Sequence, residues 1–157
     1  GKPKVVLTWA PHCRALPQAV ANSFSSFSLG YDFDLTIAHP PGFELDKQFT
    51  EGANVTTNQD EAFTNADFIY AKNWSSLNNY GKIGDISEYN DWTVDAKKMS
   101  LTNAAKFMHC LPVRRNLVVT DDVLDSSSSI CIAQAENRIW AAQTIFAELL
   151  NEVKLDK

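Results

Sequence analysis

The sequence predicts an α/β protein in which five parallel strands form a doubly wound sheet with helices on both faces, giving three layers. Two observations support this class. Short apolar runs alternate along the chain with longer segments whose apolar residues recur at helical spacing. The apolar runs are also continuous, which is typical of strands covered on both faces. The length of 157 residues fits one domain with a full-sized core, so we predict a single domain over residues 1–157.

Three strands are predicted in the first half of the chain. Strands are placed where β-branched and aromatic residues cluster, and a helix is ended where glycine follows the last apolar position. In order, the elements are a strand over Lys4–Trp9, a helix over Leu16–Leu29 ended by Gly30, a strand over Phe33–Ala38, short helical pieces over Phe43–Gly52 and Gln59–Asn65 with an extended segment Asn54–Thr56 between them, and a strand over Asp67–Ala71.

The second half opens with an irregular segment, residues 75–92, rich in Ser, Asn, Gly and Asp. A loop of that length in a compact domain is usually functional or mobile. The elements predicted after it are a helix over Val94–Leu101 capped by Thr93, a strand over Ala104–Met108, a short helix capped at Thr120–Val123, a fifth strand over Ser129–Ile132, and a long helix over Ala135–Val153 with one apolar face.

Composition excludes several classes of function. The net charge of −5 and the lack of a basic run argue against a nucleic-acid partner. No apolar stretch approaches the roughly 20 residues needed to cross a bilayer, and no signal peptide is recognisable, so we expect no membrane association. Three cysteines without CxxC spacing indicate free thiols in a reducing compartment, which predicts a cytoplasmic protein.

Polar residues of unusual type follow four of the predicted strands. In doubly wound sheets, ligands bind beyond the carboxyl ends of the strands. We therefore expect these side chains to converge on one edge of the sheet. They are His12 and Arg14 after the first strand, Lys72 and Trp74 after the third, Cys110 to Arg115 after the fourth, and Arg138 after the fifth.

The segment Phe107–Asn116 is the most informative stretch. Pro112 ends the preceding strand, because proline has no N–H for a central ladder. A cis Leu111–Pro112 bond would turn the chain sharply and aim the Cys110 and Leu111 carbonyls outward. The following pair, Arg114 and Arg115, offers planar donors for phosphate or carboxylate groups. The alternative is a strand end followed by two solvated arginines.

A metal site is a weaker interpretation. The pairs His12–Cys13 and His109–Cys110 supply zinc-type ligands, but zinc sites prefer short spacing within one loop. A third strand is expected to separate the two pairs. We predict no metal and no cofactor.

The string Phe107–Arg115, together with Thr120–Val123 and Glu136–Arg138, resembles the transcarbamylases, in particular the branch that acts on N-acylated ornithine. The likeness covers essentially the whole chain, but only the second, amino-acid-binding domain of such an enzyme. The Ser-x-Arg-Thr loop of the carbamoyl-phosphate domain does not occur in these 157 residues. The resemblance implies partnership with that missing domain, a homotrimeric parent enzyme and no cofactor.

The resemblance also implies a reaction, in arginine biosynthesis: transfer of a carbamoyl group from carbamoyl phosphate to the δ-amino group of an N-acyl-ornithine. Cys110 and Arg138 are the implied catalytic residues, with Arg138 at the carbamoyl end of carbamoyl phosphate. The carbonyls of Cys110 and Leu111 are implied to accept hydrogen bonds from the carbamoyl amide or the amine. We expect the Cys110 thiol to be a positioning group; read from its residue type alone, it is a small buried hydrophobe.

Lys72 indicates the substrate class. Enzymes acting on free ornithine resemble this chain but carry an aspartate there, which suits a cationic α-amino group; a lysine suits an α-carboxylate. His12, Arg14 and Arg114, with Leu111, complete the predicted substrate site. So many cations predict a second carboxylate, which favours an N-succinyl over an N-acetyl substrate.

Two other interpretations remain open at this point. One is a transcarbamylase acting on free ornithine. The other is a non-catalytic flavodoxin-like or nucleotide-binding module, although its Gly-rich turn is missing from Ala10–Arg14. We further expect the chain on its own to be inactive and to expose an apolar patch along the final helix.

Overall fold

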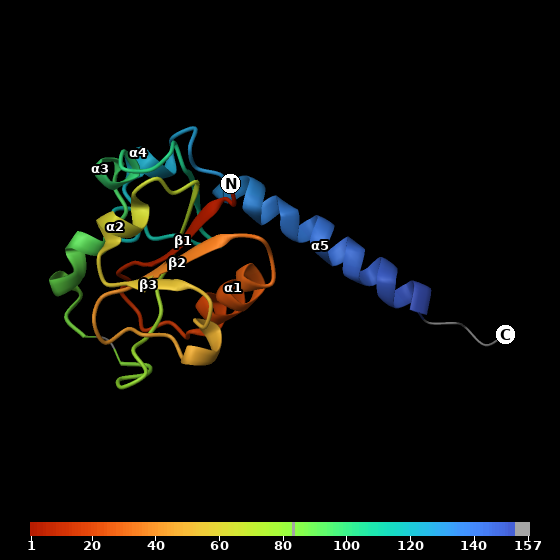
Figure 1. Ribbon diagram of the computed structural model, residues 1–157, viewed down its shortest axis with the longest axis horizontal. Helices are drawn as coiled ribbons and strands as arrows, with labels where there is room; N and C mark the ends of the chain where they lie inside the picture. Colours follow the sequence, from red (N-terminus) through yellow and green to blue (C-terminus); the bar gives the residue numbers. More distant parts are fainter. Residues whose placement is uncertain (83, 153–157) are drawn as a thin grey trace.

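A computed structural model describes residues 1–82 and 84–152, and these form a single five-stranded sheet (Figure 1). The strand order is β3-β2-β1-β4-β5, and every neighbouring pair is parallel. The chain therefore builds one half of the sheet outward from β1 and then returns to build the other half from β4. The strands are β1 Lys4–Trp9, β2 Asp34–Ala38, β3 Asn54–Thr56, β4 Phe68–Lys72 and β5 Lys106–Met108.

The helices fill the connections between the strands. They are α1 Ala19–Leu29, the 3-10 helix η1 Lys47–Phe49, α2 Gln59–Phe63, the 3-10 helix η2 Ile86–Trp92, α3 Ala96–Met99, α4 Asp121–Leu124 and α5 Cys131–Glu152. Val153, the predicted end of the last helix, lies outside the described residues. Among those described, none of the helices combines the length and the apolarity that a membrane span requires.

Two apolar cores confirm the predicted three layers, one on each face of the sheet. On β1, Val6 packs toward Phe63 of α2, and its neighbour Leu7 packs toward Ala21 of α1. Successive side chains of a strand point to opposite faces, so a strand buried on both sides must be apolar throughout. Val6 and Leu7 are fully buried, and burying each such side chain stabilises the fold by about 1.5–3 kcal/mol.

The prediction of a fifth strand over Ser129–Ile132 is wrong. Ser129 makes one isolated bridge to Phe107, and Cys131 already begins α5. The fifth strand is instead β3, the segment Asn54–Thr56 that was predicted only as an extended link. Three residues suffice there because β3 lies at the sheet edge and pairs with β2 alone.

Several helix boundaries also differ from the prediction. Asp95, not Thr93, caps α3, because its carboxylate accepts the Lys98 N–H at 2.8 Å. The predicted helical piece Phe43–Gly52 contains only η1. α1 begins at Ala19, later than predicted, and the Leu16 carbonyl before it is bonded to Ser75 rather than within a helix.

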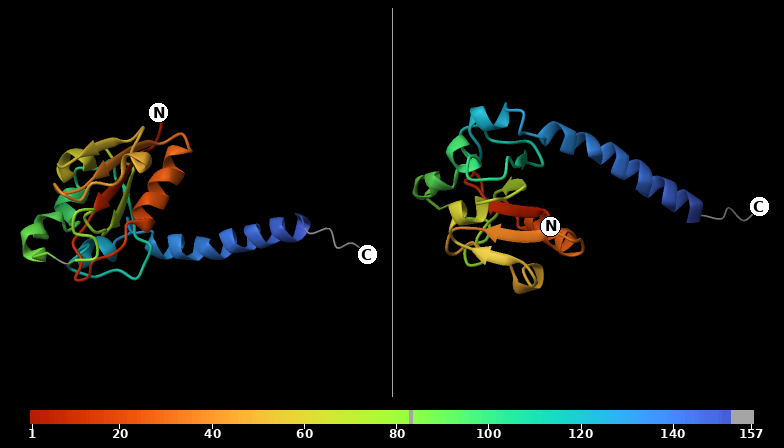
Figure 2. Two further views of the ribbon diagram at one scale, coloured as in Figure 1. Left: turned by 90° about the horizontal axis from the view of Figure 1, so that it is seen from below. Right: turned by 45° about the horizontal axis from the view of Figure 1, so that its top comes forward.

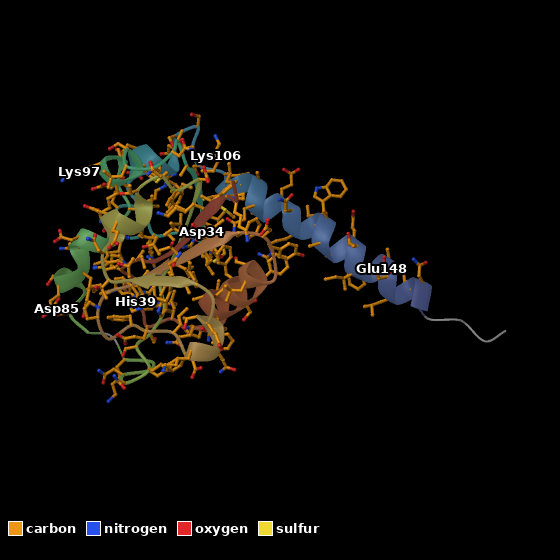
Figure 3. The ribbon with its side chains drawn as sticks, viewed as in Figure 1. Asp34, His39, Asp85, Lys97, Lys106 and Glu148 are labelled. Carbon is orange, nitrogen blue, oxygen red and sulfur yellow. The ribbon has the colours of Figure 1, made fainter. Side chains whose placement is uncertain are left out.

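Helix α5 projects from the domain on the side opposite η2, as Figure 1 and both views of Figure 2 show. Its apolar side chains are solvent-exposed, with Ile139 58%, Phe146 65% and Leu150 73% exposed. The predicted apolar patch on the final helix is therefore confirmed. His39, which directly follows β2, and Asp85, just before η2, lie on the other side of the domain (Figure 3).

Candidate functional site at the carboxyl edge of the sheet

A pocket of about 480 Å³ opens where the loops after β1 and β5 meet the end of β4. This is the point at which the strand order reverses, between β1 and β4, and doubly wound sheets bind ligands there. The structure thus brings together the sequence-predicted site residues from three strand ends. The lining residues are His12, Arg14, Leu16, Lys72, Leu111, Pro112, Val113 and Arg114.

Hydrogen bonds tie the loop after β1 to the end of β4. The Ala10 N–H donates to the Lys72 carbonyl at 3.1 Å, and the Asn73 side chain donates to the Ala10 carbonyl at 2.8 Å. Further along, both the N–H and the hydroxyl of Ser75 donate to the Leu16 carbonyl at 2.8 Å. Asn73 and Ser75 are buried, so these bonds are shielded from water. The two loops consequently hold a fixed mutual position.

An aromatic cluster surrounds Trp9, the last residue of β1. The Trp9 ring lies 4.7 Å from that of Phe43, 5.3 Å from that of Tyr89 and 6.3 Å from that of Trp92. The Trp9 indole N–H donates to the Trp74 carbonyl at 2.8 Å. Tyr89 and Trp92 belong to η2, so the long segment that was predicted as irregular packs part of its length against the end of β1.

The polar side chains of the pocket are all basic. His12, Arg14, Lys72 and Arg114 line it, and none of its eight lining residues is acidic. The His12 pKa lies below its ordinary value chiefly because burial disfavours the charged ring, and the nearby positive charges of Arg114 and Lys72 act in the same direction. A site of this kind binds anionic groups, and carboxylates match the planar arginine donors.

A tight turn shapes the β5 side of the pocket. The Leu111–Pro112 bond is cis, as the sequence predicted, and Leu111 has a φ of 49°. The Leu111 N–H donates to Nδ1 of His109 at 3.0 Å. His109 is only 3% exposed, and burial, aided by the charge of Lys72 and by His12, lowers its pKa to about 4. The histidine is therefore neutral at physiological pH.

The two adjacent arginines face different surroundings. Arg115 bonds to Asp121 and Asp125 at 2.7 Å, which anchors it to α4 and raises its pKa. Arg114 lines the pocket. Of the two, only Arg114 was placed in the predicted substrate site, and its binding role stays a prediction.

Cys110 and Arg138, the two predicted catalytic residues, do not line the pocket. The Cys110 side chain packs in the core on the α1 face, beside the Tyr70 hydroxyl, and burial together with Cys110 raises the Tyr70 pKa. Arg138 was expected after a fifth strand, but that strand is absent, and Arg138 lies exposed on α5. Their catalytic roles therefore stay predictions.

Sequence reasoning missed the roles of three residues, of which His109 and Gln59 are buried and Lys98 is partly buried. It considered His109 only within the His-Cys-Leu-Pro motif and as one of the zinc-type ligands, and it did not assign Gln59 or Lys98 any function. The Lys98 ammonium donates to Gln59 Oε1 at 2.6 Å, to the Thr93 carbonyl at 3.0 Å and to the Asp91 carbonyl. These bonds use all three donors of Lys98, so it holds η2 against α2. No signal in the sequence distinguishes it from its exposed neighbour Lys97.

Other cavities lie elsewhere on the domain. One of about 660 Å³ lies beside Lys98, but the lysine's donors are already taken by protein acceptors. A small one of about 40 Å³ shares His12 and Arg14 with the pocket. Across residues 1–82 and 84–152, no group of three or more His, Cys, Asp and Glu side chains is arranged to hold a metal ion.

Comparison with known proteins identifies the class. Residues 16–149 match the family described as "Aspartate/ornithine carbamoyltransferase, Asp/Orn binding domain". The chain belongs to this family.

Two carbamoyltransferases illustrate how similar the chain is to individual relatives. The chain is 51% identical over 154 residues to an N-succinylornithine carbamoyltransferase of Bacteroides fragilis, covering 97% of this chain and 48% of the relative. It is 37% identical over 167 residues to an N-acetylornithine carbamoyltransferase of Xanthomonas campestris, covering 95% and 49%. The chain thus spans about half the length of the curated relatives it matches.

Solved structures of a related enzyme contain a domain with the same fold as this chain. A crystal structure of N-acetyl-L-ornithine transcarbamylase superposes with a TM-score of 0.87 at 37% identity, covering 94% of this chain and 50% of that one. A variant of that enzyme complexed with carbamyl phosphate and N-succinyl-L-norvaline gives a TM-score of 0.88 at 36% identity, covering 94% and 49%.

Proposed function

We propose that this chain is the amino-acid-binding domain of a carbamoyltransferase that acts on N-succinylornithine. The observation that carries the proposal is the wholly basic set of polar side chains in the pocket, with Lys72 at the end of β4. A free amino acid would bring a cationic α-amino group into this field, where no lining carboxylate could pair with it. An N-acylated amino acid has no such charge and keeps its α-carboxylate.

The number of cations supports the succinyl group. One α-carboxylate is matched by one arginine or lysine, whereas Arg14, Lys72 and Arg114 all reach the pocket. A succinyl group adds a second carboxylate at the far end of the acyl chain, and an acetyl group adds none. The relative at 51% identity, named for N-succinylornithine, supports the same choice, against 37% for one named for N-acetylornithine.

In the proposed reaction, the neutral δ-amine attacks the carbamoyl carbon, a C–N bond forms, the C–O bond to the phosphate breaks, and phosphate leaves with the proton that the amine gives up. The product is an N-acyl-citrulline, which places the reaction in arginine biosynthesis. Arg14, Lys72 and Arg114 hold the two carboxylates, so that the flexible δ-amine meets a fixed acceptor. The carbonyls of Cys110 and Leu111 accept hydrogen bonds from the amine or the carbamoyl NH₂. Arg138 and the phosphate-binding groups of the other domain complete the site when both domains are present.

The test is a chimera in which this chain replaces the matched part of the Bacteroides fragilis relative. Carbamoyl phosphate is supplied with N-succinylornithine, N-acetylornithine or ornithine, and citrulline-type product is measured. We expect kcat/KM to be highest for N-succinylornithine and at least 10²-fold lower for free ornithine, roughly the loss caused by an unpaired charge. Highest activity with free ornithine would overturn the proposal.

A second test needs only the 157-residue chain. N-succinyl-L-norvaline, which lacks the reactive amine, is titrated and chemical shifts are followed by NMR. Shifts that cluster at His12, Lys72 and Arg114 support the assignment. Mononucleotides are the control, because the module interpretation expects them to bind instead. Shifts caused by a nucleotide and not by the norvaline compound would favour that alternative.

A further inference from the structure

We propose that His109 is a positioning residue: its neutral ring accepts the Leu111 amide N–H and thereby fixes the direction of the Leu111 carbonyl beside the pocket. The inference rests on the proposed function, since it assigns that carbonyl a part in carbamoyl transfer. His109 does not line the pocket, and Leu111 does. His109 therefore acts through Leu111 and not on the substrate.

The first argument is the backbone of Leu111. Its φ of 49° lies in the left-handed region, which residues with a Cβ rarely adopt. Such a conformation persists only where the surroundings fix it. Pro112 offers no N–H, so the Leu111 N–H is the nearest backbone donor that can hold the turn. Its bond to His109 Nδ1, at 3.0 Å, supplies that restraint.

The second argument is the protonation state. The bond needs an unprotonated Nδ1, because a protonated nitrogen would face the amide hydrogen with a hydrogen of its own. The charged or titratable groups that face His109 are Lys72 from β4, His12 from the loop after β1, and Cys131 at the start of α5, whose thiol contacts the His109 backbone. None is a carboxylate, and burial and Lys72 lower the His109 pKa to about 4. Nδ1 of His109 therefore stays unprotonated and can accept the Leu111 N–H.

The third argument is that a similar contact occurs at the same edge of the sheet, in the loop after β1. The Arg14 N–H donates to Nδ1 of His12 at 3.0 Å, again across a spacing of two residues. The His12 pKa also lies below its ordinary value. The Arg14 carbonyl also lies 3.2 Å from Nδ1 of His12, so the role of this nitrogen as donor or acceptor depends on the tautomer of its ring. In both loops that carry the pocket, a histidine Nδ1 thus contacts the backbone of the second residue after it.

Three substitutions of His109 distinguish the role of Nδ1 from that of Nε2. In His109→Asn, the amide oxygen can take the place of Nδ1, whereas in His109→Gln the amide extends to the place of Nε2. His109→Leu fills the space without any acceptor. In the chimera with the Bacteroides fragilis relative, we expect His109→Asn to keep kcat within about 3-fold. His109→Gln and His109→Leu should lose about 10²-fold in kcat, the usual cost of a 1 Å displacement, with KM for N-succinylornithine changed less than 3-fold.

Three outcomes contradict the inference: His109→Gln or His109→Leu keeping the kcat of the unsubstituted chimera, His109→Asn losing as much as the other two, or the loss falling on KM. A second measurement stands apart from activity. Nitrogen-15 NMR of the unsubstituted 157-residue chain reports which ring nitrogen of His109 carries the proton. We expect it on Nε2 from pH 7 to pH 5, with the Leu111 amide protected from exchange in the unsubstituted and His109→Asn chains only. A proton on Nδ1 would overturn the inference, whether or not the chimera is active. If the unsubstituted chimera is inactive but the spectrum is as expected, the result counts against the proposed function alone.

Discussion

Arg115 holds Asp125 through two hydrogen bonds of 2.7 Å, and this pairing commits Arg115 to α4 while its neighbour Arg114 lines the pocket. Paired planar donors on a carboxylate define a direction as well as a charge. Two identical side chains, adjacent in sequence, therefore have separate tasks.

The two arginines should respond differently to substitution. Arg114→Ala is expected to weaken binding of N-succinyl-L-norvaline by the 157-residue chain about 10- to 100-fold, because a carboxylate loses its partner. Arg115→Ala should lower the melting temperature and leave binding within about 2-fold. Isothermal titration and thermal denaturation of both variants check this, and equal losses of binding would show that Arg115 also contacts the ligand.

Lys72 sets the charge preference of the pocket. Lys72→Asp should reduce turnover of N-succinylornithine by the chimera about 10² or more, because an ion pair becomes a repulsion. The control is Lys106→Asp, which makes the same change of charge at the first residue of β5, away from the pocket edge (Figure 3). Steady-state kinetics of both variants decide the matter. Retention of activity within a few-fold by Lys72→Asp would remove Lys72 from the site.

His109 should make the fold sensitive to acid. Its pKa is about 4 in the folded chain and about 6.5 when unfolded, so between these values the unfolded chain binds more protons. Its contribution is thus fully present above about pH 6.5 and is lost as pH falls toward 4, amounting to at most about 3 kcal/mol. Urea denaturation at several pH values should show a smaller fall for His109→Asn than for the unsubstituted chain. Parallel curves would contradict the assignment.

The exposed face of α5 should drive self-association of the isolated chain. Ile132, Ile139 and Phe146 repeat every seven residues and are all more than half exposed, which forms one continuous apolar stripe. Sedimentation should show mass rising with concentration. Phe146→Lys should suppress the rise, and Asn137→Lys, the same addition at an exposed polar position on the opposite face of α5, should not. We also expect no carbamoyl transfer by this chain alone, since it lacks the Ser-x-Arg-Thr loop.

The sequence predicts the sheet well because buried strands have a local signature. Val5, Val6 and Leu7 are apolar in succession, and only burial on both faces requires that. The same criterion fails at Ser129–Ile132, where a short β-rich run supplies one bridge and then begins a helix. It also undervalues Asn54–Thr56, since an edge strand needs neither length nor continuous apolarity. In segments this short, hydrophobic periodicity cannot distinguish a strand from a helix or a loop.

The pocket is predicted in part for a similar reason. The strand ends locate His12, Lys72 and Arg114, because parallel strands bring their carboxyl ends to one edge. Which of the two adjacent arginines lines the pocket depends on Asp121 and Asp125, several residues further on, because they bind Arg115. Hydrophobic periodicity does not predict that pairing. The acceptor role of His109 depends on burial and on one backbone angle at Leu111. Those properties exist only in the folded chain.

The buried bonds from Asn73 to Ala10 and from Ser75 to Leu16 have a consequence for divergence within the family. They join two loops that are more than 50 residues apart in sequence into one rigid frame. An insertion in either loop would disturb bonds that hold both loops, so we expect relatives to change the two loops together or to leave both unchanged. Side chains that project from the frame, such as Arg14, can be exchanged singly. We therefore expect a change of acyl group to depend on such projecting side chains more than on the lengths of these two loops.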